Sequence, residues 1–267
     1  MKTNEKSSVD QEYVEKINAE LAELFESDVK EFSKNGARAF GHILAKYGID
    51  NPQKWLEEKM REDNGNPDFK PYSYNPNIFA EGQYFPETRE IQFKSLKSAR
   101  KKFLRAHEMA HKITFGFRDK KHHFNMVKKH GFTGSLGFYL DEGVSNMIAE
   151  KLSGISFLEK TTLYPSQTLS AWKLAQKIGV EAVYEIAFFD PTSLKNKWKK
   201  FDNHRALKRK LAIKLSPFNL LSPIKQYRFR HIFTKNGKTR YVKELLKNIK
   251  KAERKSEKIT QRIFLKT

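Results

Sequence analysis

The sequence predicts an α+β fold that is mainly helical and contains a small sheet. Apolar residues recur every three or four positions in several segments, which is typical of amphipathic helices. Residues 82–93 contain two short β-prone runs around a turn, which indicates a small pair of strands. Asn236-Gly237 separates two further β-prone runs and predicts a hairpin near the C-terminus. Hydrophobic residues make up 38% of the 267 residues, so the chain has enough apolar material for a core.

The N-terminal part is expected to form three helices, over about 9–32, 37–47 and 52–63. The first has an amphipathic face that consists of Val9, Tyr13, Val14, Ile17, Leu21, Leu24, Phe25, Val29 and Phe32. Gly48 would end the second helix, and Asn51 would cap the third with Pro52 in its first turn.

The middle of the chain alternates loops with helices. Residues 64–77 are rich in Pro, Gly and Asn and are expected to form a loop. Ser95 or Ser98 can cap the helix that contains residues 103–113. Further helices are expected over about 136–152, 166–178, 180–189 and 192–212, the first of them stopped by Gly154.

The positive charge is concentrated at the C-terminus. Residues 191–267 hold 24 Lys and Arg against 4 acidic residues, a net charge of +20, whereas residues 1–190 hold 28 against 27. The hairpin at about 226–242 and a basic helix at about 243–260 lie in this region. We therefore expect a helical cap or subdomain over 1–70, a core over 71–215 and a basic extension over 216–267.

Several protein classes are excluded or disfavoured by composition. The chain has no cysteine, so it forms no disulfide, and any zinc site must use His, Asp or Glu. The N-terminal sequence lacks the apolar segment of a secretory signal, and no stretch approaches the roughly 18 apolar residues of a membrane span. We expect a cytoplasmic protein, or one exported without a cleaved signal peptide.

His107-Glu108-Met109-Ala110-His111 forms an HExxH motif inside one of the expected helices. Four residues are slightly more than one turn, so both imidazoles project from one face and can bind one Zn²⁺. Glu108 lies on an adjoining part of that face, where it can take a proton from a water that the metal activates. A surface helix that merely carries His and Glu is the alternative. The motif predicts a zinc hydrolase with Glu108 as general base.

A catalytic zinc ion usually has three protein ligands and one open position. Asp141-Glu142-Gly143 offers Glu142 on a later expected helix. Here the chain resembles the gluzincin metallopeptidases, the thermolysin-like zincins, in which a downstream Glu is the third ligand. The resemblance covers about 82–152 and implies a zincin-like core with His107, His111 and Glu142 as ligands. It also implies that the segment 82–93 aligns an extended substrate by strand pairing.

Other residues leave alternatives open. Asn146 occupies the place where thermolysin-like members keep an Asp that orients a ligand histidine. Lys129-His130-Gly131 is similar to the His-Gly element of SprT-like proteases, which would make His130 the third ligand instead of Glu142. His122 and His123, in a Lys-rich segment, are expected to be solvated. The oxyanion-stabilising donor stays unassigned among Tyr139, Tyr164, Tyr184 and His204.

The expected substrate is a protein or peptide, and the basic extension suggests a second partner. Its cations and interleaved aromatic residues are typical of nucleic-acid binding, although an acidic protein or an anionic surface would attract the same charge. A nucleic-acid-associated SprT-like protease is one alternative function. A non-catalytic nucleic-acid-binding protein with a zincin core is another, but such a protein would not need Glu108.

Overall fold

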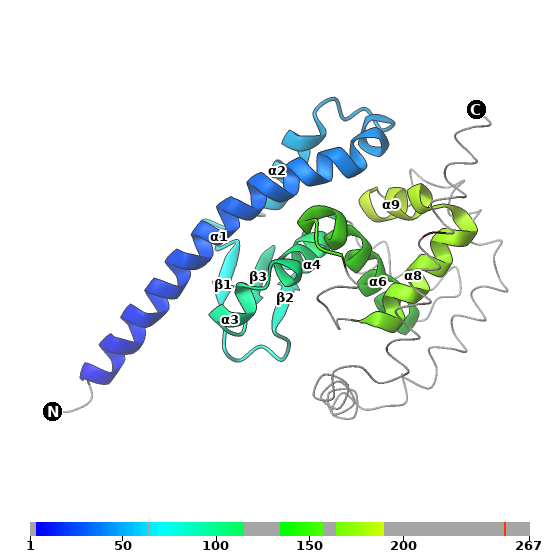
Figure 1. Cartoon of the computed structure of the whole chain (residues 1–267). Helices are drawn as coiled ribbons and strands as arrows, with labels where there is room; N and C mark the ends of the chain where they lie inside the picture. The colour runs from blue at the N-terminus through cyan, green and yellow to red at the C-terminus, as the bar shows by residue number, and fades with distance from the viewer. Residues whose placement is uncertain (1–3, 64, 115–133, 157–163, 190–253, 255–267) are drawn as a thin grey trace. The chain divides into compact units, whose positions relative to one another are not determined.

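The computed structural model describes residues 4–63, 65–114, 134–156, 164–189 and 254. These residues form helices and one three-stranded sheet, which confirms the predicted mainly helical α+β class (Figure 1). The chain divides into two compact units. The first comprises Met1–Ile113 and Ile148–Ile155, and the second comprises Thr114–Met147 and Ser156–Thr267. The division into 1–70, 71–215 and 216–267 stays a prediction.

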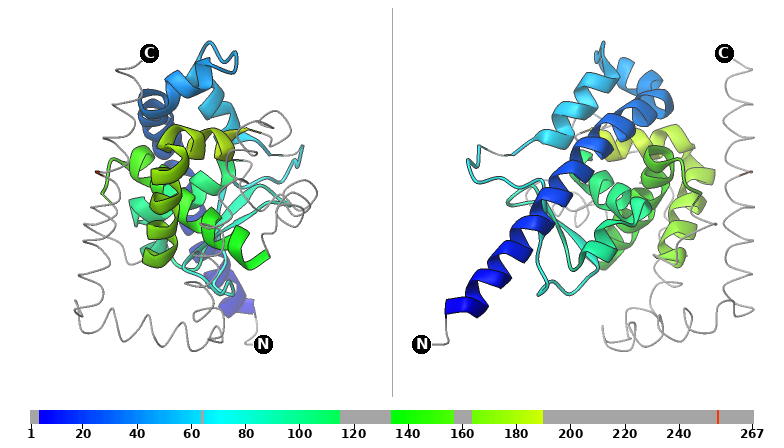
Figure 2. Two further views of the ribbon diagram at one scale, coloured as in Figure 1. Left: turned by 90° about the vertical axis from the view of Figure 1, so that its right-hand side faces the viewer. Right: turned by 60° about the vertical axis from the view of Figure 1, so that its left-hand side comes forward.

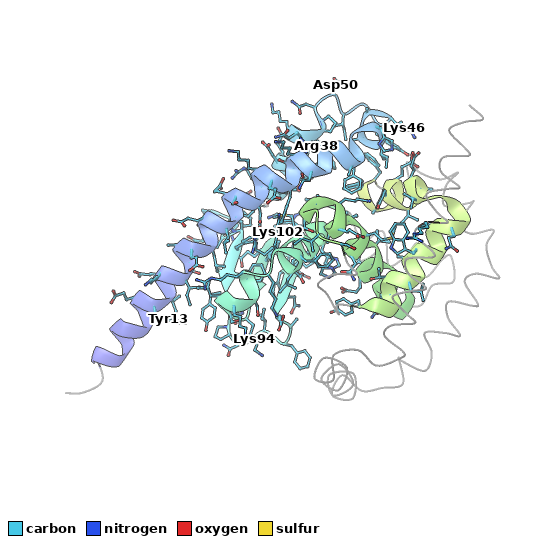
Figure 3. The ribbon with its side chains drawn as sticks, in the orientation of Figure 1. Tyr13, Arg38, Lys46, Asp50, Lys94 and Lys102 are labelled. Carbon is cyan, nitrogen blue, oxygen red and sulfur yellow. The ribbon has the colours of Figure 1, made fainter. Side chains whose placement is uncertain are left out.

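The first unit is organised along the helix α1, Asn4–Ala45. Between Ile17 and Phe32 the predicted apolar face packs against the rest of the unit, with all its members buried except the half-buried Leu24. Before Ile17 the prediction is wrong, because Tyr13 is 60% exposed and Val14 is 36% exposed. The N-terminal turns of α1 extend beyond the sheet, and Figure 3 marks Tyr13 on this part of the helix (Figures 2 and 3).

The predicted break between helices at 33–36 is wrong, because α1 continues through Gly36. A Cβ at this position would lie 2.8 Å from Leu56 Cδ1 and 3.1 Å from Leu152 Cδ2. Glycine therefore allows two neighbouring helices to approach α1 closely. Glycine inside a helix costs about 1 kcal/mol relative to alanine, and the burial of two leucines there offsets that cost.

The end of α1 and the start of α2, Pro52–Arg61, follow the sequence prediction. Gly48 adopts φ +79°, a left-handed conformation that suits glycine and ends the helix. The side chain of Asn51 accepts a hydrogen bond from Lys54 N at 3.0 Å, and Pro52 lies in the first turn. Both boundaries depend on local chemistry.

The sheet has three short strands in the order β1-β3-β2. The strands β2, Gly82–Phe85, and β3, Glu90–Phe93, pair antiparallel around a turn, as the sequence predicts. The strand β1, Tyr72–Tyr74, pairs parallel with β3 and lies in the segment predicted to be a loop. The loop prediction is wrong because a three-residue strand between Pro71 and Pro76 has little local strand signal. The segment becomes a strand through its pairing with β3, which lies later in the chain.

Aromatic side chains connect α1 to the sheet. The Tyr72 ring makes edge contacts with Phe25 and Phe93, with ring centroids 5.2 Å apart in both pairs. Tyr72, Ile91 and Phe93 are buried, so the core of the first unit lies between α1 and the sheet.

The predicted helix after Ser95 consists of two helices, α3, Leu96–Ala99, and α4, Lys102–Ile113. Ser95 is the N-cap of α3, and its hydroxyl accepts a hydrogen bond from Ser98 N at 3.1 Å. Lys102 at the start of α4 forms a 2.5 Å ion pair with Glu31 of α1 (Figure 3). The helix α4 also packs against β2, which places the HExxH helix between α1 and the edge of the sheet.

Three further helices confirm the predictions for 136–152, 166–178 and 180–189. They are α6, Gly134–Ser153, α8, Pro165–Ile178, and α9, Val180–Phe188. The last turns of α6 belong to the first unit, where Asn35 Nδ2 donates to Leu152 O at 2.8 Å. The predicted elements at 192–212, 226–242 and 243–260 lie outside the described residues, apart from the helical Arg254. None of the helices within the described ranges is long and apolar enough to cross a membrane.

Candidate metal centre

The two histidines of the HExxH motif lie on α4, one turn apart and both buried. Their Nε2 atoms are 3.3 Å apart, and their rings meet edge to face with centroids 4.8 Å apart. The helical spacing of four residues therefore directs both imidazoles to one point, as predicted.

Glu142 is the third member of the cluster. It lies in α6 and is 3% exposed. One ligand atom from each of His107, His111 and Glu142 lies within 4.8 Å of the others. Among the described residues this is the one group of three or more such side chains that could hold a metal ion.

The donor set fits a transition metal of the zinc type. Two imidazole nitrogens and one carboxylate are a common ligand set for catalytic zinc, which leaves one coordination position open. A divalent cation held between the three side chains would also balance the negative charge of the buried Glu142 carboxylate. The chain offers no thiolate, so softer metals that prefer sulfur are disfavoured.

Glu108 is buried beside this group but is held by the sheet. Its Oε2 accepts a hydrogen bond from the backbone N–H of Tyr84 in β2, at 2.9 Å. Lys94 N donates to Glu81 O at 3.0 Å. In an antiparallel ladder hydrogen-bonded pairs alternate with non-hydrogen-bonded pairs, so the odd-numbered residues of this segment are the ones that exchange backbone hydrogen bonds with the β3 side. The N–H of Tyr84 therefore points to the outer edge of β2, towards α4.

Two charged side chains near the HExxH motif were not among the predicted site residues. Lys112 follows His111 directly and is 1% exposed, and its Nζ donates to Arg89 O at 2.7 Å. Arg89 ends the β2–β3 turn, and its Nη1 donates to the hydroxyl of Tyr84 at 3.0 Å. The contact between Lys112 and Arg89 joins residues 23 positions apart, so a sequence of charged residues around a turn gives no signal for it.

The position of Glu142 is also linked to the packing of α6 in the second unit. A Cβ on Gly143 would lie 2.3 Å from the carbonyl oxygen of Gln167, so α8 approaches α6 closely at the residue after Glu142. Three residues later, Asn146 Nδ2 donates to Thr168 Oγ1 at 2.8 Å, and Thr168 Oγ1 donates to Tyr164 O. These contacts do not test the resemblance of Asn146 to the Asp that orients a ligand histidine in thermolysin-like proteins.

The remaining predicted site residues are placed as follows. Tyr164 precedes α8 with φ +49°, and Tyr184 is buried in α9. Tyr139 lies in α6. The alternative ligand His130 lies outside the described residues, as do His122, His123 and His204. The identity of the oxyanion donor thus stays open.

Comparisons with known proteins do not assign the chain to a family: no protein-family model, curated protein or solved structure matches it. The interpretation of the site therefore depends on the chemistry and geometry of its own residues.

Proposed function

We propose that the protein is a zinc-dependent peptidase in which His107, His111 and Glu142 bind the ion and Glu108 is the general base. The observation that carries this proposal is the convergence of the three ligand atoms within 4.8 Å in a buried setting. Glu108, on the same helix as the two histidines, is not one of the three proposed ligands. A purely structural zinc site would use four protein ligands and would have no need for this carboxylate.

The chemistry divides between the ion and the protein. The ion would supply Lewis acidity, which makes water a nucleophile near neutral pH. Glu108 would take the proton of the attacking water and give it to the leaving amine. The hydrogen bond from Tyr84 N holds one carboxylate oxygen of Glu108, so the base is oriented before substrate arrives.

A peptide substrate suits the position of this base. The strand β2 is at an edge of the three-stranded sheet, and its outer edge carries the N–H that contacts Glu108. An extended peptide can pair with a strand at the edge of a sheet, and pairing along the part of β2 that Glu108 does not occupy would bring a backbone carbonyl close to the base. This supports a peptide substrate over a small molecule.

The Glu108→Gln variant tests the proposed reaction. We expect it to bind stoichiometric zinc and to melt at the temperature of wild type, but to cleave a peptide library about 10²–10⁴-fold more slowly, as general-base loss does. Glu26→Gln, which changes an exposed carboxylate on α1, is the matched control and should cleave normally. Cleavage by Glu108→Gln within threefold of wild type would disprove the role of the base.

The third ligand is tested by metal content. Glu142→Ala should lose zinc to the same extent as His111→Ala, because an open catalytic site needs three protein ligands. His130→Ala should keep its zinc. The reverse result, with His130 required and Glu142 dispensable, would favour the SprT-like alternative.

A second function, association with nucleic acid, is favoured by the +20 charge of residues 191–267. Binding should weaken steeply with salt because each neutralised phosphate releases counterions. Deletion of 216–267 should abolish retention on single- or double-stranded nucleic acid and leave cleavage of a short peptide unchanged. No retention of the full chain at about 50 mM salt, where such contacts are strong, would exclude this function.

A further inference from the structure

We propose that Arg89 is a positioning residue for Glu108, because it fixes β2 against α4 so that Tyr84 N–H meets the carboxylate. The consequence for catalysis rests on the proposed function. The positioning itself rests on contacts within the first unit alone, and it can be measured without any activity.

The backbone conformation of Arg89 is the first part of this positioning. Arg89 ends the turn between β2 and β3 with φ +61°, a left-handed conformation that is uncommon for a residue with a Cβ. Such a conformation persists where the surroundings hold it. Here Lys112 Nζ donates to the Arg89 carbonyl at 2.7 Å and lies 4.4 Å from the centre of the Phe69 ring.

The side chain of Arg89 is the second part. Its Nη1 donates to the Tyr84 hydroxyl at 3.0 Å, and its Nη2 lies 2.9 Å from Glu62 Oε2, just after α2. Lys59 lies 3.3 Å from the same carboxylate oxygen of Glu62. The guanidinium therefore attaches the ring of Tyr84 to the end of another helix.

Tyr84 is consequently held at both ends. Its backbone N–H donates to Glu108, its hydroxyl accepts from Arg89, and the side chain between them is 6% exposed. A buried ring fixed at its hydroxyl cannot rotate or shift without moving its own backbone. The position of the N–H that orients Glu108 is thus set by the guanidinium of Arg89.

The two attachments of the hairpin to α4 lie one turn apart on that helix. Residues 108 and 112 have the spacing that places side chains on one helical face. Tyr84 N reaches Glu108, and the Arg89 carbonyl reaches Lys112. Two points define the direction of the hairpin along α4, whereas a single hydrogen bond would leave it free to pivot. Catalytic groups require such fixing to within about half an ångström.

Arg89→Asn is the informative variant, because asparagine tolerates the left-handed conformation while its short side chain removes the guanidinium from Tyr84 and Glu62. Amide hydrogen exchange is measured by NMR on the full chain loaded with Zn²⁺. We expect the Tyr84 amide to exchange about tenfold faster than in wild type, as loss of a supported hydrogen bond implies. The Ile91 amide, which donates to Pro71 O at 2.9 Å, should change less than twofold.

Three further variants complete the test. Lys112→Met, which removes the other attachment, should also accelerate exchange at Tyr84. Arg89→Lys keeps a cation and should restore part of the protection. Lys101→Met removes an exposed 2.5 Å ion pair with Glu81, just before β2, and is the control that should leave Tyr84 exchange unchanged.

Activity supplies the second readout. Zinc content should stay at the wild-type level in Arg89→Asn, kcat should fall about tenfold, and KM should change less than twofold, because the base and not the substrate is misplaced. Unchanged exchange at Tyr84 in both Arg89→Asn and Lys112→Met would overturn the proposal, and so would an equal acceleration at Ile91. If wild type cleaves no peptide, the proposed function fails, and the exchange rates alone decide the role of Arg89.

Discussion

The two ends of α4 carry one buried cation each, and the two are stabilised differently. Arg105, two residues before His107, is 6% exposed, and its Nε and Nη2 atoms lie 2.5 and 3.0 Å from the carboxylate oxygens of Asp28 in α1. Lys112, one residue after His111, is 1% exposed and contacts a backbone carbonyl and the Phe69 ring. The two histidines of the candidate metal centre lie between these two attachments along α4.

The difference follows from the chemistry of the two side chains. A guanidinium stays charged in proteins and matches a carboxylate with two parallel hydrogen bonds, so its burial requires an acidic partner. An ammonium can lose its proton, and burial together with the nearby Arg89 charge lowers the pKa of Lys112 to about 7. Arg105 therefore holds α4 to α1 through an ion pair, whereas Lys112 acts as a hydrogen-bond donor.

Asp28 also joins the core of the first unit. The hydroxyl of Tyr72 donates to Asp28 Oδ2 at 2.8 Å, and Arg105 Nη1 donates to Ala99 O at 2.6 Å. Burial and the Asp28 carboxylate raise the pKa of Tyr72 well above its ordinary value, so the hydroxyl remains a donor. One buried network thus links α1, the sheet and α4 beside the candidate metal ligands.

The largest expected effect is that of Arg105→Met. Removing one partner leaves the Asp28 carboxylate buried without its cation, which typically costs about 3–5 kcal/mol. Urea denaturation of the metal-free protein should show a loss of this size in the free energy of unfolding. A loss below 1 kcal/mol would mean that the ion pair is unimportant, and the contrast with Lys112 would disappear.

The double variant Asp28→Leu, Arg105→Met should be more stable than Arg105→Met alone. Replacing both members of a buried pair with apolar side chains removes the uncompensated charge, and such replacements are often nearly neutral. We expect recovery of about half or more of the loss, reduced by the hydrogen bond that Tyr72 gives up. The free energies of unfolding of the four proteins in the cycle measure this coupling. Additive losses would contradict it.

Lys112→Met should destabilise the first unit by only about 1 kcal/mol. The Arg89 carbonyl loses a donor, but the cost of burying an amine disappears at the same time. The same denaturation experiment at pH 8 provides the measurement. A loss as large as that of Arg105→Met would show that Lys112 is held as tightly as the arginine.

The smallest expected effect is that of Lys102→Met, which breaks the other ion pair between α4 and α1. The side chains of Lys102 and Glu31 are 32% and 45% exposed, so solvent screens the pair. Exposed pairs contribute about 0–1 kcal/mol. The Lys102–Glu31 pair joins the same two helices as the Arg105–Asp28 pair, so Lys102→Met is the control for Arg105→Met. A loss above about 2 kcal/mol in the free energy of unfolding would show that the burial of an ion pair matters less than the helices it connects.

Features that depend on local chemistry were determined by the sequence. The left-handed Gly48 and the Asn51 cap delimit α1 and α2 because a missing Cβ and a short side-chain amide act within a few residues. The turn between β2 and β3 is equally local. In the HExxH motif, helical spacing alone puts two imidazoles on one face, so the pair His107 and His111 could be predicted without knowledge of the fold.

The features that depend on contacts between distant residues follow from tertiary packing. Gly36 stays helical because Leu56 and Leu152 pack on it, and β1 is a strand because β3 pairs with it. The resemblance suggested Glu142, with His130 as an alternative, and the grouping of Glu142 with the two histidines within 4.8 Å has no local signature in the sequence. The hydrogen bond from Tyr84 to Glu108 joins backbone to side chain across 24 residues, and a backbone N–H has no signature in sequence. A local preference depends on neighbouring residues and can be read from a short stretch of sequence. A contact between distant segments forms only when the whole chain folds.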